Sequence, residues 1–205
     1  MDIFLQLNRD KLKAIFIRLS LVLLGVVSIV LAIAYLTGNL PNRQLLVSII
    51  LVTGIGFPLF IMSLGYMVWS LNRRARQKVF SKTPFNLIEN IGFYKAYLDK
   101  SSKWALTEEI KEGKLNDFTL RMNLSKEKGY HFIEFDIPVE WKKLEKSEYN
   151  SLAEKFKQHN AEFRIGSIIK LYDTRQQASQ TVSDIKQDLE IFTTLLRQEG
   201  FEPKA

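Results

Sequence analysis

Residues 19–72 read LSLVLLGVVSIVLAIAYLTGNLPNRQLLVSIILVTGIGFPLFIMSLGYMVWSLN, and Arg43 is the only charged residue among them. Arg43 separates a charge-free stretch of 24 residues, Leu19–Asn42, from one of 29 residues, Gln44–Asn72. An α-helix of about 20 apolar residues crosses the ~30 Å hydrocarbon layer of a bilayer. The sequence therefore predicts a hairpin of two transmembrane helices, over 15–37 and 45–72, joined by a short external loop at 38–44.

The net charge of +7 is unevenly distributed along the 205 residues. Residues 1–82 hold ten basic and two acidic residues, whereas residues 83–205 hold nineteen basic and twenty acidic residues. A nucleic-acid-binding domain would concentrate basic charge on its soluble fold. Because the excess instead flanks the apolar stretches, we expect a lipid bilayer and no nucleic acid as the partner of the basic residues.

The basic residues also predict the orientation of the hairpin, because short flanking segments rich in Lys and Arg stay in the cytoplasm. Four basic residues precede the first stretch, and the segment predicted as a basic juxtamembrane linker, 73–82, holds five more: Arg73, Arg74, Arg76, Lys78 and Lys82. Both termini are therefore expected in the cytoplasm. The small size and the absence of cysteine suggest a bacterial inner membrane.

A cleavable signal peptide is the alternative for the first stretch, because Ala32-Ile33-Ala34 resembles a cleavage site. The apolar run Leu19–Leu36 is 18 residues long, whereas a signal core is typically 7–15 residues long. This length favours a retained span.

Small residues in both stretches predict close helix packing, which in lipid depends on van der Waals contact. The first stretch has such residues on one helical face, and the second has glycines and a proline: Gly25, Ser28 and Ala32, then Gly54, Gly56 and Pro58. Packing within the hairpin is favoured over an oligomer interface. Pro58 lacks a backbone N–H, so a kink is expected one turn earlier, near Gly54.

Two further features concern the ends of the hairpin. Residues 1–14 form a cytoplasmic amphipathic segment, either lying in the membrane interface or extending the first span. Tyr66 and Trp69 suit the aromatic belt at the cytoplasmic interface.

The sequence of residues 83–205 predicts one cytoplasmic α+β domain, which begins after Thr83-Pro84. Alternating apolar residues over 118–124 and 133–139, around a polar turn at 125–129, predict an antiparallel hairpin. Further strands are expected at 104–106 and at 163–171, the latter with a bulge at Gly166. Helices are expected at Phe85–Leu98, from Ser147 to about Asn160, and from about Ser179 to Glu199. The predicted architecture is a small antiparallel sheet with helices mainly on one face.

Few residues suggest a catalytic, metal-binding or ligand-binding site. His131 and His159 each lack carboxylate partners at a metal-binding spacing, and Glu108, Glu109 and Glu112 lie among lysines, which favours a solvated surface. Asp173 and Arg175 follow a strand and are candidates to hold a polar ligand. Trp104 and Trp141 are candidates to contact a partner. No cofactor and no metal is expected, because no phosphate-binding loop, zinc signature or catalytic triad is present.

These features predict a membrane-anchored, non-enzymatic protein-binding module, such as an accessory subunit of an inner-membrane assembly, with a protein partner or a second copy in the membrane. The alternative is a ligand-sensing membrane effector that oligomerises and perturbs the bilayer. An enzyme with an unfamiliar site is the third hypothesis.

Overall fold

The computed structural model describes residues 2–99, 102, 105–125, 131–140, 145–175 and 180–204. The chain divides into two compact units. The first unit comprises Met1–Asn72 together with Asp99–Thr107, and the second comprises Arg73–Leu98 together with Glu108–Ala205. Each unit is therefore built from two separate stretches of the sequence.

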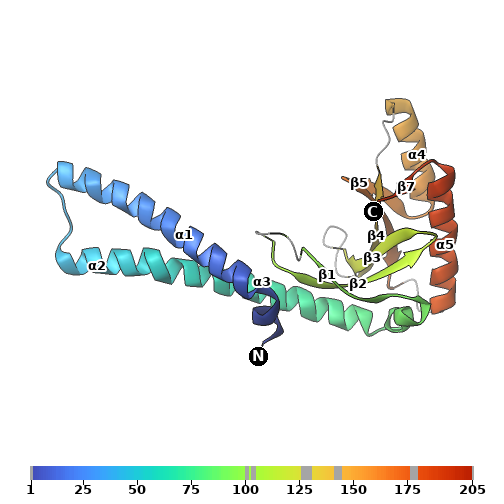
Figure 1. The fold of residues 1–205 in the computed structure, drawn as a ribbon, viewed down its shortest axis with the longest axis horizontal. Coiled ribbons are helices and arrows are strands. Elements are labelled where there is room, and N and C mark those ends of the chain that lie inside the picture. The colour runs from blue at the N-terminus through green and yellow to red at the C-terminus, as the bar shows by residue number, and fades with distance from the viewer. Residues whose placement is uncertain are drawn as a thin grey trace. The chain divides into compact units, whose positions relative to one another are not determined.

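The first unit consists mainly of long helices (Figure 1). Helix α1 covers Ile3–Leu36, α2 covers Arg43–Leu51, a π-helical turn η1 covers Val52–Gly56, and α3 covers Phe57–Phe80. Asp2 and Asn42 begin α1 and α2, because their side-chain oxygens each accept a hydrogen bond of 2.9 Å from a backbone N–H of the first turn. Because α1 is continuous from Ile3, residues 3–14 of the expected segment belong to the same helix as the first apolar stretch.

Near Gly54, where the sequence predicts a kink, the chain forms the π-helical turn η1. The Phe57 N–H bonds to the carbonyl oxygen of Val52, five residues earlier. Pro58 has no N–H to donate to the carbonyl oxygen of Gly54, four residues earlier. The hydroxyl of Ser20 on α1 donates to this oxygen instead, at 2.7 Å.

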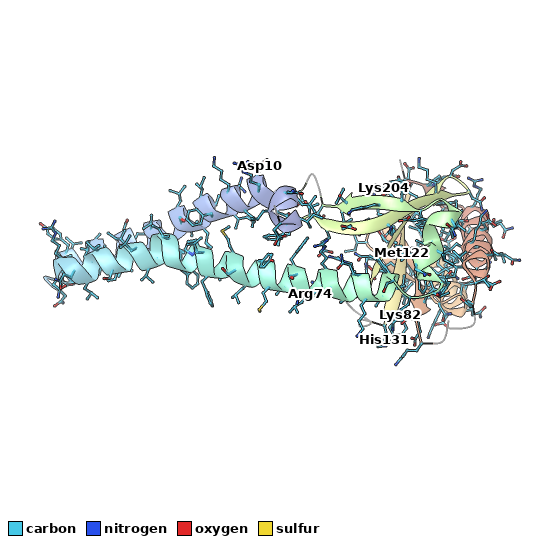
Figure 2. The ribbon with its side chains drawn as sticks, turned by 90° about the horizontal axis from the view of Figure 1, so that it is seen from below. Asp10, Arg74, Lys82, Met122, His131 and Lys204 are labelled. Carbon is cyan, nitrogen blue, oxygen red and sulfur yellow. The ribbon has the colours of Figure 1, made fainter. Side chains whose placement is uncertain are left out.

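The helices Ile3–Leu36 and Arg43–Phe80 are long and apolar enough to cross a membrane by length and composition. Only 6% and 11% of the residues in their most apolar windows are buried. The side chains of both helices accordingly project outward along most of their length (Figure 2).

The second unit is an α+β fold with a seven-stranded antiparallel sheet, as the sequence predicts in outline. Its strands are β1 (Tyr94–Leu98), β2 (Glu108–Leu115), β3 (Phe118–Leu124), β4 (Phe132–Glu140), β5 (Ala161–Arg164), β6 (Ser167–Asp173) and β7 (Glu202–Pro203). The order across the sheet is β1-β2-β3-β4-β6-β5, and β7 pairs with β4. The helical elements are η2 (Phe85–Ile91, a 3₁₀ helix), α4 (Lys146–Gln158) and α5 (Val182–Gln198).

The predicted hairpin of β3 and β4 is confirmed, with Met122 opposite Phe135 and Leu124 opposite Ile133. Their connection at 126–130 lies outside the described residues. The alternating apolar residues of both strands are fully buried and form one core with η2, α4 and α5. The predicted apolar face of the last helix is part of this core through Ile185, Leu189, Phe192 and Leu196.

Two predictions for residues 85–106 are wrong. Phe85–Leu98 is not one helix: a 3₁₀ helix ends at Ile91, Gly92 adopts a φ of 92°, and strand β1 follows. A positive φ is readily accessible to glycine and stops the helix. Ala105 and Leu106 belong to no strand, and β2 begins at Glu108 instead. Five of the eight residues in β2 are charged, so this strand lacks a clear apolar period.

The single strand expected at 163–171 is wrong, because the predicted bulge at Gly166 is a hairpin turn between two strands. Gly166 has a φ of 80°, and β5 and β6 pair on either side of it, with Arg164 opposite Ser167. The expected helix starts also shift. Helix α4 begins at Lys146, because the Glu148 carboxylate accepts a 3.0 Å bond from the Glu145 N–H. Helix α5 is capped by Thr181, and the predicted start at Ser179 lies outside the described residues.

Candidate functional site

The basic segment 73–82 is largely helical, because α3 continues to Phe80. Val79 is buried in the core of the second unit, and Ala75 and Phe80 pack against that core. Arg74 and Lys78 are exposed on the other side of the helix. The last turns of α3 therefore have a buried apolar face and an exposed basic face.

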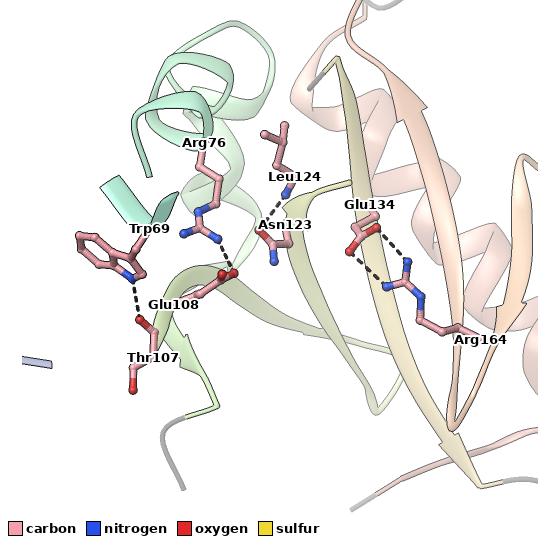
Figure 3. A network of polar contacts seen from close by, with 8 residues as sticks. All are labelled: Trp69, Arg76, Thr107, Glu108, Asn123, Leu124, Glu134 and Arg164. Carbon is pink, nitrogen blue, oxygen red and sulfur yellow. Dashed lines mark hydrogen bonds and ion pairs between the residues drawn. The ribbon is translucent and has the colours of Figure 1, made fainter. Parts of the chain in front are cut away.

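Arg76 lies on the buried side of this segment and pairs with Glu108 of β2 (Figure 3). Arg76 Nη1 lies 2.6 Å from Glu108 Oε2, and the residues are 4% and 9% exposed. Arg76 Nη2 has no hydrogen-bond partner among the described residues. Arg76 lines a cavity of about 30 Å³ together with residues that include Gln77, Phe80 and Ile110. This volume is enough for a single water molecule.

The sequence predicts a solvated surface for Glu108, Glu109 and Glu112. This prediction is wrong for Glu108, which is buried beside Arg76. The sequence does not show this contact. Glu109 pairs with Lys95 at 2.8 Å. Glu112 accepts a 2.8 Å hydrogen bond from the Tyr94 hydroxyl. These hydrogen bonds raise the pKa of Lys95, through Glu109, and the pKa of Tyr94, through Glu112. Glu109 and Glu112 thus pair across to strand β1, whereas Glu108 pairs with helix α3.

Trp69 of the first unit is buried and is not an exposed interfacial side chain. Its indole Nε1 donates to the carbonyl oxygen of Thr107 at 3.0 Å (Figure 3). Its ring centroid lies 5.0 Å from that of Phe4. Leu12 is buried in the same cluster, and Leu106 packs against it. Leu106 and Thr107 are thus part of the packing around the start of α1.

Asn8 fixes the same segment through its amide group. Its Oδ1 accepts a hydrogen bond from the Thr107 N–H at 2.7 Å, and its Nδ2 donates to the Phe4 carbonyl oxygen at 3.2 Å. Asn8 is fully buried. Both roles of the amide are therefore satisfied inside the first unit.

The predicted packing residues separate into two groups. Gly54 and Pro58 are buried, and a Cβ at Gly54 would lie 3.2 Å from Leu24 Cδ2. Gly56 is exposed, as are all three residues of the α1 stripe: Gly25, Ser28 and Ala32. Helix α1 therefore contacts the π-helical turn through Ser20 and Leu24, and the stripe of small residues faces away from this contact.

Asp173 and Arg175 are brought together, and each binds the other. Arg175 Nη2 lies 2.6 Å from Asp173 Oδ2, and Arg175 Nε lies 2.9 Å from Asp173 Oδ1. The hydrogen bond from the Arg175 side chain lowers the pKa of Asp173 to about 2. The pair forms a closed bidentate contact at the end of β6. The other two proposed contact residues, Trp104 and Trp141, lie outside the described residues.

The second unit contains a buried lysine, Lys170, that the sequence pattern does not single out. Lys170 is 3% exposed, and its Nζ lies 3.1 Å from Asp188 Oδ2 and 3.0 Å from the carbonyl oxygen of His159. The Tyr172 hydroxyl donates to Asp188 Oδ2 at 2.5 Å. Burial lowers the pKa of Lys170 and raises that of Tyr172. In the sequence, Lys170 lies between Ile169 and Leu171. The only indication of its burial is that a charged residue stands in an apolar strand.

Both histidines pack beside phenylalanine rings. Among the described residues, no group of three or more His, Cys, Asp or Glu side chains is placed to hold a metal ion. The His131 ring lies 4.6 Å from the Phe132 ring, and the His159 ring lies 6.1 Å from the Phe192 ring.

No protein-family model matches the chain, and neither a curated protein nor a solved structure matches it significantly.

Proposed function

We propose that the chain is a membrane-anchored module that acts by binding another protein at the cytoplasmic face of a bacterial inner membrane, as an accessory subunit of a larger assembly. The observation that carries this proposal is the exposure of the two apolar helices. Only 6% and 11% of the residues in their most apolar windows are buried. Soluble proteins rarely expose such large apolar surfaces. Lipid is the solvent that makes this exposure favourable.

Binding rather than catalysis is supported by the state of the charged groups in the second unit. Arg76 pairs with Glu108, Lys170 with Asp188, and Arg175 with Asp173. Charged side chains that form ion pairs with one another stabilise the fold and help to define the shape of its surface. We infer that the second unit presents a folded surface to a partner.

The orientation can be tested directly because the chain has no cysteine. Single cysteines replace Asn39, in the turn between α1 and α2, or Lys204, near the C-terminus. A membrane-impermeant maleimide added to intact cells should label Asn39→Cys, and Lys204→Cys only after lysis. Labelling of Lys204→Cys in intact cells would overturn the orientation, and recovery of the chain in the soluble fraction would overturn the anchor.

A protein partner in the membrane is supported by the exposed stripe of small residues on α1. Small side chains let a second helix approach closely in lipid. A photo-crosslinking residue at Ser28, on the exposed stripe, should join the chain to another protein in native membranes. The same residue at Val27, which is partly buried, is the matched control and should react mainly within the chain. Lipid adducts alone at Ser28 would contradict a partner on this face.

The π-helical turn next to Pro58 favours one second candidate, the ligand-sensing effector, because such turns often occur at functional sites. In that case Ser28 would crosslink to a second copy of the chain. Liposomes containing the protein would also release an entrapped dye. Tight liposomes and a different crosslinked protein would support the accessory subunit instead.

A further inference from the structure

A groove of about 510 Å³ runs along one side of the first turns of α1. Its lining includes Arg9, Asp10, Lys11, Ala14 and Arg18 of the helix and Ser102 of the segment Asp99–Thr107. We call it the basic groove. All of these residues belong to the first unit. The volume lies within the range of ordinary small-ligand sites.

The charges of the basic groove favour an anion. Arg9, Lys11 and Arg18 contribute three positive charges, and Asp10 contributes the single negative charge among the lining residues. Arginine carries planar donors that match phosphate oxygens. The groove is therefore suited to a phosphate group.

The wall of the groove is held in place by hydrogen bonds. Lys11 Nζ donates to the carbonyl oxygen of Ala105 at 2.8 Å and also to that of Asp99. The Ser102 hydroxyl oxygen accepts a 3.0 Å bond from the Ala105 N–H. Lys11 thus positions the segment that carries Ser102, while Arg9 and Arg18 lie about 14 Å apart along the helix axis.

The place of the groove in the sequence identifies the source of the phosphate. Arg18 directly precedes the charge-free stretch that begins at Leu19. If the hairpin is inserted as proposed above, on which this inference rests, the groove lies at the cytoplasmic headgroup layer. Anionic lipids of that leaflet attract juxtamembrane basic residues. We propose that the basic groove binds the headgroup of an anionic phospholipid.

The test measures binding of phosphatidylglycerol and of phosphatidylcholine to the full chain in detergent micelles by native mass spectrometry. The double variant Arg9→Gln/Arg18→Gln should lose the preference for phosphatidylglycerol over phosphatidylcholine, because it removes two of the three positive charges that line the groove. The matched control, Arg74→Gln/Lys78→Gln, removes two exposed charges outside the groove and should retain the preference. An equal loss in both double variants would overturn the site.

Two more arms complete the test. Ala14→Trp fills the groove while keeping every charge, and it should abolish the preference for phosphatidylglycerol; unchanged binding would contradict the groove. Inorganic phosphate at millimolar concentration should not displace the lipid, and full displacement would overturn the lipid assignment. Failure of membrane insertion would appear separately, in the cysteine labelling, because these measurements use detergent.

Discussion

Arg76 and Glu108 are 32 positions apart in sequence, yet they form a buried ion pair of 2.6 Å in the second unit. Removing water from both charges costs free energy, which their attraction and hydrogen bond offset. A change to one partner leaves the other charge buried. Such pairs therefore have large effects when broken, whereas exposed pairs have small ones.

We predict that Glu108→Gln lowers the free energy of unfolding of the second unit by about 3–5 kcal/mol, because the Arg76 charge stays buried without its partner. Urea denaturation of the full chain in detergent, followed by circular dichroism, measures this loss. Glu89→Gln is the matched control, since it breaks the Lys111 pair at an exposed carboxylate, and it should cost less than about 1 kcal/mol. Equal effects of both changes would contradict the argument.

At the end of β6, we predict a carboxyl pKa of about 2 for Asp173, measured by nuclear magnetic resonance as a function of pH. The folded pKa lies below the ordinary value of 3.8. The contribution of this carboxylate to stability is therefore complete above pH 3.8 and is lost as the pH falls through 2.

Arg175→Gln tests the cause of the Asp173 shift, because it removes the side chain that lowers the pKa. The Asp173 midpoint should then rise toward 3.8. The stability difference between the wild type and Asp173→Asn should also shrink as the pH falls from 5 to 2. A wild-type midpoint at 3.8 or above would refute the role of the pair.

Among the elements, the π-helical turn η1 shows how one proline affects two helices. Pro58 cannot donate to the Gly54 carbonyl oxygen, and Ser20 of α1 donates in its place at 2.7 Å. Gly54 also lets Leu24 approach closely. The break in α2–α3 is thus part of the contact between the helices of the hairpin.

We predict that Ser20→Ala destabilises the hairpin by about 0.6–1.7 kcal/mol, the range of hydrogen bonds between membrane helices. Pro58→Ala supplies the missing N–H, so Ser20→Ala should cost less when Pro58→Ala is also present. A double-mutant cycle on thermal midpoints in detergent measures this coupling. Ser63→Ala is the control, because this hydroxyl donates only within its own helix, to Leu59. Strict additivity would exclude the coupling.

For the whole molecule, the boundary between the two units falls inside α3, at Asn72 and Arg73. The residues that form the core of the second unit run from Val79 to Phe201. Its fold therefore includes the last turns of a helix that begins in the first unit.

We predict that a fragment of residues 73–205 folds cooperatively without detergent, whereas a fragment of residues 83–205 is much less stable. The shorter fragment lacks Val79 and leaves Glu108 buried without Arg76. Dispersed amide resonances and a cooperative urea transition should be seen for the longer fragment only. Equal stability of the two fragments would show that α3 contributes nothing to the second unit.

Local sequence was sufficient to predict the helical hairpin, the β3–β4 pair and the apolar face of α5. Each of these elements depends on a pattern within one segment. The hairpin follows from the length of its charge-free stretches, the strands from apolar residues at every second position, and α5 from apolar residues at steps of three and four. The kink expected near Gly54 stays a prediction, and the π-helical turn found there was not predicted.

Tertiary structure alone decided which polar residues are buried and what they contact. Glu108 and Lys170 look like surface residues in sequence, but strand pairing and helix packing place Arg76 and Asp188 beside them. Asp99–Thr107 joins the first unit through Asn8, Lys11 and Trp69, and no local pattern indicates these contacts. The physical reason is that the burial of a charge depends on partners far away in the chain, whereas the hydrophobic length of a helix depends only on its own residues.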